Sequence, residues 1–491
     1  MRMFTVKATA IVMMAALPTS LGFAQSTAPQ SISAADKATG SKAHPELLAE
    51  FGGLYAGSQA DYVRRVGQKI SVQSGLSNAQ SDFTISLLNS PVNNAFAIPG
   101  GYVYVTRQLL GLMNDEAELA SVLGHETGHV AARHSQRRQS AATRNSVLGA
   151  LGQLGVGLLL GGNSQIGQLL SKGIGTGAQA LTLKFSRSQE YEADDLGVAY
   201  LAKSGYDPMA SSTMLASLAA QSALDARSRG QDGRSTPTWA SSHPDPASRV
   251  TRAAQKARAT GTKPGVRNRD VFLNALNGTL YDDDPKQGVV DGQVFRHPEL
   301  RLMFTVPNGF AMSNGSQAVT ISGSGGQAQF TGAAYNGDLR AYIASAFSAV
   351  SGGQGSLPAN DVQTTQVNGI NAAYSTARAN TQSGQVDVTI FAYAFDATRA
   401  YHFVIIAPAG QGVGPFSSLT QSMRRMTATE AAAVKPRMIQ VVTVKSGDTV
   451  ASLSARMAYP TLQAERFRTL NALPAGAALR PGQRVKIVVY G

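Results

Sequence analysis

Residues 115–131 read DEAELASVLGHETGHVA, a stretch that should be helical and that contains the pattern His-Glu-x-x-His. Because a helix advances about 3.6 residues per turn, His125 and His129 project from one face, one turn apart. Two imidazoles at this spacing can bind one Zn²⁺ ion, and Glu126 beside them can take a proton from a metal-bound water. The stretch therefore predicts a helix that carries a hydrolytic metal site.

The same stretch indicates where this helix begins and which face it buries. Asp115 can be the N-cap, with Glu118 at the third position of a capping box. His134 lies five residues after His129 and falls off the ligand face, so we assign it to the surface. The apolar side chains expected to face the core are Leu119, Val122, Leu123 and Val130.

A catalytic zinc site has three protein ligands and one open position, so a third ligand must come from elsewhere. Ser186 and Gln189 form a capping box, which makes Glu190 the opening of a second helix, with Asp194 one turn later on the same face. Glu190 can then bind the metal while Asp194 accepts a hydrogen bond from a ligand imidazole. An acidic cluster at a helix start also interacts favourably with the helix dipole without any chemistry. The upstream His-Glu-x-x-His favours the ligand interpretation.

A histidine in a proline-rich turn, His243, is a further candidate for the cleft. Pro244 and Pro246 stiffen this turn, and Arg249 follows at the start of a helix. His243 can stabilise an oxyanion or occupy the open metal position in a resting state. Without the metal motif, it would be a loop histidine in solvent.

Residues 94–105 read as strand, tight turn and strand. An exposed strand near the metal can hold an extended peptide by backbone hydrogen bonds, and the alternative is an ordinary hairpin. The candidate substrate-binding residues are Asn94, Ala95, Phe96, Ala97, Gly100 and Gly101.

Composition places the chain among globular proteins of several domains. It has 491 residues, of which 43% are hydrophobic and 15% charged. The absence of Cys excludes disulfides, a thiol nucleophile and lipid attachment through an N-terminal Cys. The net charge of +13 is spread along the chain. We therefore expect solvation and contact with anionic envelope surfaces, peripheral membrane contact included, and no nucleic acid partner.

The N-terminus has the pattern of an export signal. Arg2 and Lys7 precede an apolar run at residues 8–17, and a small-x-small cleavage site follows at residues 22–24. We expect a signal peptide at residues 1–24 and a periplasmic location. An apolar segment at residues 147–170 is interrupted by glycines and is too short to span a bilayer, so it is a buried or hairpin helix, or else a membrane-facing or mobile lid.

The rest of the chain divides by texture. Residues 25–43 are rich in Ser, Ala, Thr and Gln, which predicts a flexible leader. A helix-rich domain follows at 44–265. Residues 286–430 read as a separate α+β domain of unreadable chemistry, with strands at 317–321 and 386–393 and a helix at 339–350. Residues 438–491 read as a compact module of strand, two short helices and strand.

Four segments together resemble the HtpX-like and CAAX-prenyl-protease-like zinc metallopeptidases of the gluzincin type, in the family's order: residues 94–101, 125–129, 190–194 and 243–249. The resemblance implies a mainly helical zincin-type protease domain with a small sheet. It also implies exported members that act in quality control, with unfolded or misassembled envelope proteins as substrates. The implied roles are one Zn²⁺ held by His125, His129 and Glu190, Glu126 as general base, Asp194 behind the ligands, and His243 and Arg249 in the cleft.

The C-terminal module resembles a LysM domain at residues 442–450, 470–473 and 479–487. That resemblance implies binding to N-acetylglucosamine-containing glycans such as peptidoglycan. The Tyr-Pro at 459–460 departs from the pattern, and the alternative is a module that only packs. Two rival functions remain open: a metal-loaded chaperone-like binding protein whose site His243 closes, and a peptidoglycan-directed hydrolase.

Overall fold

A computed structural model of the chain describes residues 31–138, 185–228, 243, 245–350, 360–381 and 384–491. The predicted signal peptide (1–24) and the apolar segment 147–170 lie outside the described residues. In the described part of the chain, no helix is long and apolar enough to cross a bilayer.

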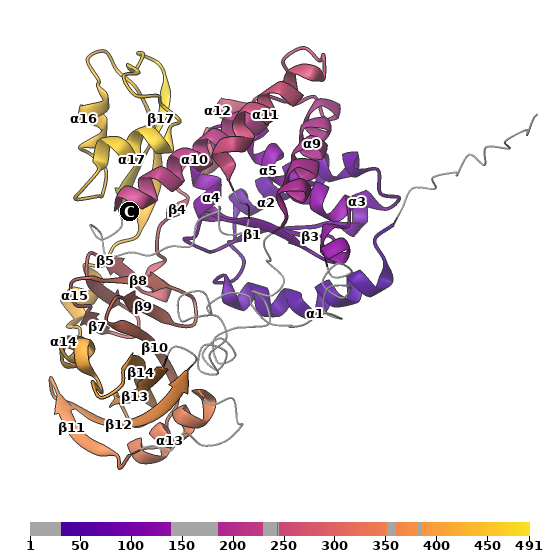
Figure 1. Ribbon diagram of the computed structural model, residues 1–491. Helices are drawn as coiled ribbons and strands as arrows, with labels where there is room; N and C mark the ends of the chain where they lie inside the picture. The colour runs from indigo at the N-terminus through magenta and orange to yellow at the C-terminus, as the bar shows by residue number, and fades with distance from the viewer. Residues whose placement is uncertain (1–30, 139–184, 229–242, 244, 351–359, 382–383) are drawn as a thin grey trace, which may run out of the picture.

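The N-terminal unit is a helical domain built around a small sheet (Figure 1). Its elements are α1 (Ala34–Glu50), α2 (Ser58–Ser71), α3 (Ala79–Asp82), β1 (Thr84–Leu88), β2 (Ala95–Ile98), β3 (Tyr102–Thr106), α4 (Arg107–Leu112), α5 (Glu116–Ala131), α9 (Arg187–Lys203), α10 (Ala210–Ser228), α11 (Pro246–Ala259) and α12 (Arg269–Leu276). The sheet has the order β1-β3-β2, with β1 parallel and β2 antiparallel to β3. Helix α5 contacts β2, β3, α2, α9 and α10, so it lies at the centre of the unit.

The predicted hairpin at residues 94–105 is present as β2 and β3. Ala95 pairs with Val105 and Ile98 with Tyr102. Gly100 and Gly101 form the turn with φ values of 94° and 85°, a region that favours glycine. A Cβ on Gly101 would lie 2.2 Å from the backbone oxygen of Asp82, so this position has no room for a side chain.

The predicted flexible leader is wrong for residues 34–43, which belong to helix α1. Ser33 caps this helix by accepting a hydrogen bond from the backbone N–H of Asp36 at 3.0 Å. Gly40 lies so close to the β2–β3 turn that a Cβ there would be 2.1 Å from the backbone oxygen of Pro99, and Leu47 is fully buried. Tertiary contact therefore stabilises a helix whose own sequence carries little apolar signal.

The middle unit is rich in strands, as predicted for residues 286–430. A seven-stranded antiparallel sheet has the order β11-β12-β13-β14-β10-β9-β8, and a four-stranded sheet has the order β15-β7-β6-β5. The elements are β5 (Val289–Asp291), β6 (Val294–His297), β7 (Leu302–Thr305), β8 (Phe310–Asn314), β9 (Val319–Gly323), β10 (Gly326–Ala334), α13 (Leu339–Val350), β11 (Gln363–Val367), β12 (Ile370–Thr381), β13 (Gly384–Ala394), β14 (Arg399–Pro408), α14 (Ser417–Ser422), β15 (Arg424–Arg425) and α15 (Ala428–Ala432). The predicted helix at 339–350 is confirmed as α13, which contacts β12 and β13.

The C-terminal unit has the predicted order of strand, helix, helix and strand. These elements are β16 (Arg437–Thr443), α16 (Val450–Ser454), α17 (Gln463–Leu470) and β17 (Arg484–Tyr490). A short strand from the bridging segment, β4 (Leu280–Tyr281), pairs with β16 and extends the sheet to three strands.

This unit is not the separate module that the sequence predicts, because it shares one hydrophobic core with the N-terminal unit. Phe467 and Ile487 belong to the same buried cluster as Leu119 of α5. Lys486 of β17 is fully buried, and its Nζ donates to the carbonyl oxygens that end α4: those of Gly111 (2.8 Å), Leu112 (3.3 Å) and Met113 (2.5 Å). The lysine thus satisfies acceptors that a helix C-terminus leaves open.

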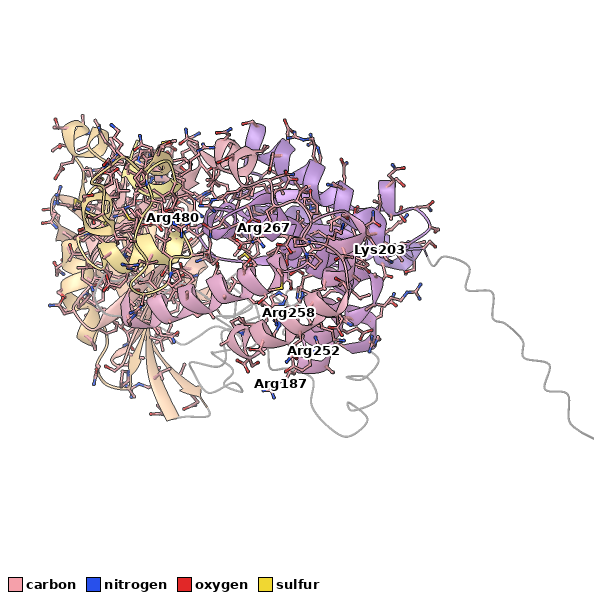
Figure 2. All side chains as sticks on the ribbon, turned by 90° about the horizontal axis from the view of Figure 1, so that it is seen from above. Arg187, Lys203, Arg252, Arg258, Arg267 and Arg480 are labelled. Atoms are coloured by element: carbon pink, nitrogen blue, oxygen red, sulfur yellow. The ribbon has the colours of Figure 1, made fainter. Side chains whose placement is uncertain are left out.

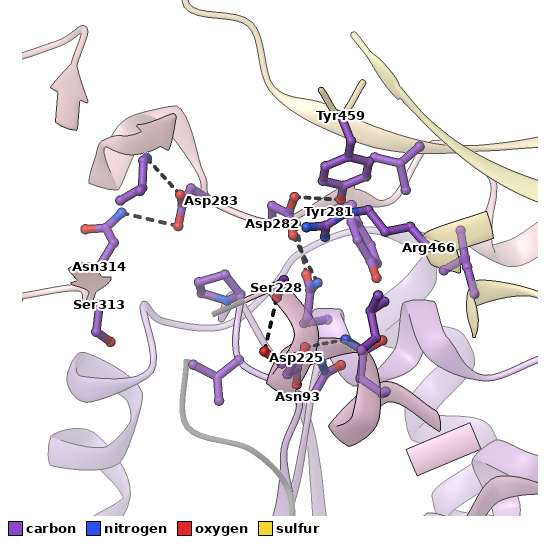
Figure 3. Close-up of a pocket in the computed structure, with 18 of the residues that line it drawn as sticks. Asn93, Asp225, Ser228, Tyr281, Asp282, Asp283, Ser313, Asn314, Tyr459 and Arg466 are labelled. Carbon is purple, nitrogen blue, oxygen red and sulfur yellow. Dashed lines mark hydrogen bonds between the residues drawn. The ribbon is translucent and has the colours of Figure 1, made fainter. Parts of the chain in front are cut away.

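The three units meet at a cavity of about 330 Å³, shown in Figure 3. Tyr459, the tyrosine that departs from the LysM pattern, donates its hydroxyl to Asp282 at 2.7 Å. The guanidinium groups of Arg437 and Arg466 lie 4.8 and 4.4 Å from the centre of its ring. Tyr459 therefore joins the C-terminal unit to the bridging segment, which gives its unusual position a structural role.

The positive charge is distributed over several elements. Figure 2 labels six basic residues, which range from α9 and α11 to Arg480 of the C-terminal unit. Arg187 and Arg258 are exposed, whereas Arg252 pairs with Asp195 at 2.6 Å. The spread agrees with the interpretation of the charge as mainly solvating.

Candidate metal centre

Helix α5 carries the His-Glu-x-x-His residues and begins where the sequence predicts. The Asp115 carboxylate accepts a hydrogen bond from the backbone N–H of Glu118 at 2.9 Å, which confirms the N-cap. The reciprocal half of the predicted capping box differs, because the Glu118 carboxylate accepts from the N–H of Asn114 at 2.8 Å. Every residue from Glu116 to His129 is buried, so the motif faces protein on all sides.

Helix α9 brings the predicted third ligand to α5. The capping box of Ser186 and Gln189 is present as predicted. The two helices cross at glycines: a Cβ on Gly128 would lie 3.2 Å from the Ala193 carbonyl oxygen, and one on Gly197 would lie 3.2 Å from the His125 nitrogen. This close approach places the first turn of α9 beside the two histidines.

Four side chains converge into a group that can hold a metal ion. The Nε2 atoms of His125 and His129 each lie 3.6 Å from an oxygen of Glu190. Nδ1 of His243 lies 3.1 Å from both Glu190 oxygens. One nitrogen or oxygen from each of these four residues lies within 4.8 Å of all the others, and all four residues are buried. Such a set of imidazole and carboxylate donors suits a divalent transition metal.

Glu126, the residue after His125, has a buried carboxylate without hydrogen bonds to any residue that the structure describes. It is fully buried, and neither carboxylate oxygen has a hydrogen-bond partner among the described residues. Burial raises its pKa, against the lowering effect of the nearby His243 and His125. A buried carboxylate without a hydrogen bond is costly, so its retention points to a proton-accepting role.

Asp194 and Arg249 lie behind the group, as predicted for Asp194. The Asp194 carboxylate is 3.1 Å from Nδ1 of His125. Arg249 binds Asp194 through two nitrogens at 2.8 and 2.6 Å and reaches Glu190 at 2.5 Å. Burial raises the pKa of Asp194, but the hydrogen bonds from Arg249 and His125 outweigh it and hold the pKa far below its usual range.

His243 is held in the centre rather than in solvent. Only 1% of its surface is exposed, and its Nε2 lies 3.5 Å from a Glu126 oxygen. After it, Asp245 caps α11 in a left-handed conformation, with φ of 59°, by accepting from the N–H of Ser248 at 3.3 Å. The turn therefore points His243 inward, between the carboxylates of Glu190 and Glu126.

The assignment of His134 to the surface is wrong. His134 is fully buried, and its Nδ1 lies 2.8 Å from Nδ1 of His129. The chain reverses at Arg133, whose φ is 54°, so that His134 comes back beneath the helix end. Helical spacing alone has no signal for this reversal, because a left-handed turn at arginine is uncommon.

The strand expected to bind substrate is at the edge of its sheet, but the predicted exposure is wrong, because whole residues including their main chain are buried. Residues Ala95–Ile98 are all buried. Asn94 accepts from the N–H of Thr106 at 3.0 Å, and because bonded and non-bonded pairs alternate, the backbone groups of Ala95 and Ala97 point to the outer edge. A small cavity of about 40 Å³ lies beside Ala97 and His129, so this edge adjoins the metal group.

Comparison with known proteins gives two family matches. Residues 57–257 match the model of peptidase family M48, and residues 442–488 match that of the LysM domain. A β-barrel assembly-enhancing protease of Yersinia pestis is 31% identical over 220 residues, which are 45% of this chain and 43% of the relative. The mitochondrial metalloendopeptidase OMA1 of Schizosaccharomyces pombe is 30% identical over 218 residues, 44% of this chain and 59% of the relative.

A third relative, the metalloprotease LoiP of Escherichia coli, is 32% identical over 181 residues, 35% of this chain and 61% of the relative. The chain therefore spans less than two thirds of the length of each of these relatives.

Proposed function

Because residues 57–257 are a peptidase family M48 domain and residues 442–488 a LysM domain, we propose that this chain is an exported zinc-dependent endopeptidase that cleaves envelope proteins. One observation carries the proposal: the buried group of His125, His129, Glu190 and His243 lies beside the carboxylate of Glu126, which is buried without a hydrogen bond among the described residues. The names of the relatives, which are a β-barrel assembly-enhancing protease and two metalloproteases, support the same reading.

In this proposal, His125, His129 and Glu190 hold one zinc ion. Bound zinc supplies the positive charge that acidifies a water molecule and polarises a peptide carbonyl. Glu126 accepts the proton of the attacking water at a carboxylate oxygen and later gives it to the departing amine.

His243 controls access to this chemistry. Its ring lies 3.1 Å from Glu190 and 3.5 Å from Glu126. The ring therefore occupies the space between these carboxylates, where the attacking water and the scissile carbonyl have to bind. His243 would be a further ligand of a bound metal in the resting chain, and with substrate present it would stabilise the developing negative charge. Asp194 orients His125, and Arg249 holds the two carboxylates in place.

The peptide lies along the outer edge of β2. Its backbone groups pair with those of Ala95 and Ala97, which point away from β3. Both residues are buried, so this edge has to be uncovered before a peptide pairs with it. The turn at Gly100 and Gly101 fixes the strand's end. Binding through the backbone suits extended, unfolded segments of many sequences. Together with the predicted export signal, this favours quality control of unfolded or misassembled proteins in the periplasm.

The C-terminal unit brings the peptidase to peptidoglycan. One side of it is committed to the N-terminal unit through Lys486, while the segments 445–449 and 472–482 are largely exposed. These exposed segments leave surface for a glycan chain. We therefore treat residues 438–491 as a glycan-binding module rather than a module that only packs.

The decisive experiment compares the wild type with Glu126→Gln on an unfolded protein and on peptidoglycan, with zinc present. Protein cleavage should disappear in Glu126→Gln while one zinc per chain stays bound, because the variant removes the base but none of the ligands. Cleavage that persists in Glu126→Gln would refute the assigned base. Wild-type release of peptidoglycan fragments without protein cleavage would favour the hydrolase, and binding of unfolded protein without turnover would favour a chaperone-like protein.

A further inference from the structure

A third histidine near α5, His134, contacts His129 on the side away from the metal group. Helix α5 ends at Ala131, and Arg133 adopts φ of 54°, a conformation that non-glycine residues rarely take. The reversal buries His134 completely and places its Nδ1 2.8 Å from Nδ1 of His129. A strained turn that buries a polar ring needs a compensating role.

Contacts from α9 fix the position of His134. Its Nε2 lies 3.1 Å from the Glu192 carboxylate, which also accepts from Arg137 at 2.8 Å. Its backbone oxygen accepts a hydrogen bond from the side chain of Gln189 at 3.1 Å. His134 therefore packs against α9, the helix that also carries Glu190.

These contacts decide where the protons lie. A carboxylate only accepts, so Nε2 of His134 carries the proton that binds Glu192, and its Nδ1 is left with a lone pair. That lone pair can accept only from a protonated Nδ1 on His129. Nε2 of His129, 3.6 Å from Glu190, then presents its lone pair to the metal group. His125 has the equivalent support from Asp194, at 3.1 Å.

We propose that His134 is a positioning residue, which fixes the tautomer and ring orientation of His129 through a relay that ends at Glu192. This inference rests on the proposed zinc function of His129. The residue acts on metal affinity and does not touch the substrate. Outer partners of this kind typically contribute about 10- to 100-fold to metal affinity.

The test compares two substitutions of His134 in the full chain. His134→Leu has similar bulk but no acceptor, whereas His134→Asn places an oxygen where Nδ1 was. We expect the zinc dissociation constant, from competition with a chromophoric chelator, to rise about 10- to 100-fold in His134→Leu and to recover most of that loss in His134→Asn. The visible spectrum of the Co²⁺-loaded chain should change in His134→Leu and stay close to the wild type in His134→Asn.

A matched control is His44→Asn, since His44 bonds Tyr104 through Nδ1 at 2.7 Å in the same unit and is not one of the residues of the metal group. It should leave the zinc affinity unchanged. Glu192→Gln, which leaves the buried ring in place, should weaken zinc binding by a smaller factor and covers the case in which His134→Leu does not fold. Wild-type affinity in both His134→Leu and Glu192→Gln, or equal loss in His134→Leu and His134→Asn, would overturn the inference. A wild-type chain that does not bind zinc would overturn the proposed function instead.

Discussion

Replacing Arg249 by methionine tests how the centre tolerates its buried carboxylates. Only 1% of Arg249 is exposed, and it makes three charge-assisted bonds, two to Asp194 and one to Glu190. Removing one partner of a buried ion pair leaves uncompensated charge and costs about 3–5 kcal/mol. For a unit of this size, the loss corresponds to a fall in melting temperature of about 6–20 °C.

The chain offers a closely matched control one turn further along α11. Arg252 also binds both oxygens of one carboxylate, that of Asp195, at 2.6 and 2.7 Å, but its side chain is 27% exposed and that of Asp195 is 33% exposed. A pair in contact with water is worth about 0–1 kcal/mol, so Arg252→Met should lower the melting temperature by only about 0–4 °C.

Both variants are measured by calorimetry after metal removal, so that zinc does not mask the loss of Arg249. The double variant Arg249→Met with Asp194→Asn should regain part of the stability, because it removes one of the stranded charges. An equal effect of Arg249→Met and Arg252→Met would refute the argument that burial, rather than the ion pair itself, sets the cost.

Three further predictions concern other parts of the chain. Lys486→Met keeps the bulk of the side chain but strands the carbonyl groups that it satisfies, so we expect a loss of about 1–3 kcal/mol in the free energy of unfolding from urea titration; an unchanged midpoint would contradict it. Burial lowers the pKa of His402 to about 4. Because the unfolded chain then binds the proton more readily, the middle unit should lose up to about 3 kcal/mol as the pH falls from 6.5 to 4, and hydrogen exchange should show that His402→Leu abolishes this dependence. Chelation of the metal should lower the melting temperature of the N-terminal unit, by an amount that readded zinc restores, and an unchanged transition would argue against a metal in the native centre.

Local sequence signals predicted those parts of the structure that depend on neighbouring residues. Both caps, at Asp115 and Ser186, lie where the pattern places them, and the helix at 339–350 has the predicted bounds. The convergence of Glu190 with the histidines also agrees with the prediction, which came from the need of a hydrolytic metal site for a third ligand and not from local spacing.

The errors all involve contacts between distant parts of the chain. Helix α1 depends on the fit of Gly40 against Pro99, which no local pattern reveals. His134 depends on a left-handed residue, Arg133, for which arginine gives no indication. Lys486, about whose position the sequence makes no prediction, is fully buried, because its acceptors come from another unit.

The common core of the peptidase and the C-terminal unit has a mechanical consequence. A tether of flexible residues would raise the local concentration of the enzyme near the cell wall and leave its orientation free. Here Lys486 of β17 binds the end of α4, which directly precedes α5, the helix that carries His125 and His129. If this unit binds a glycan strand, as proposed above, the strand would set the orientation of the metal group as well as its location, and that orientation would select the proteins that come within its reach.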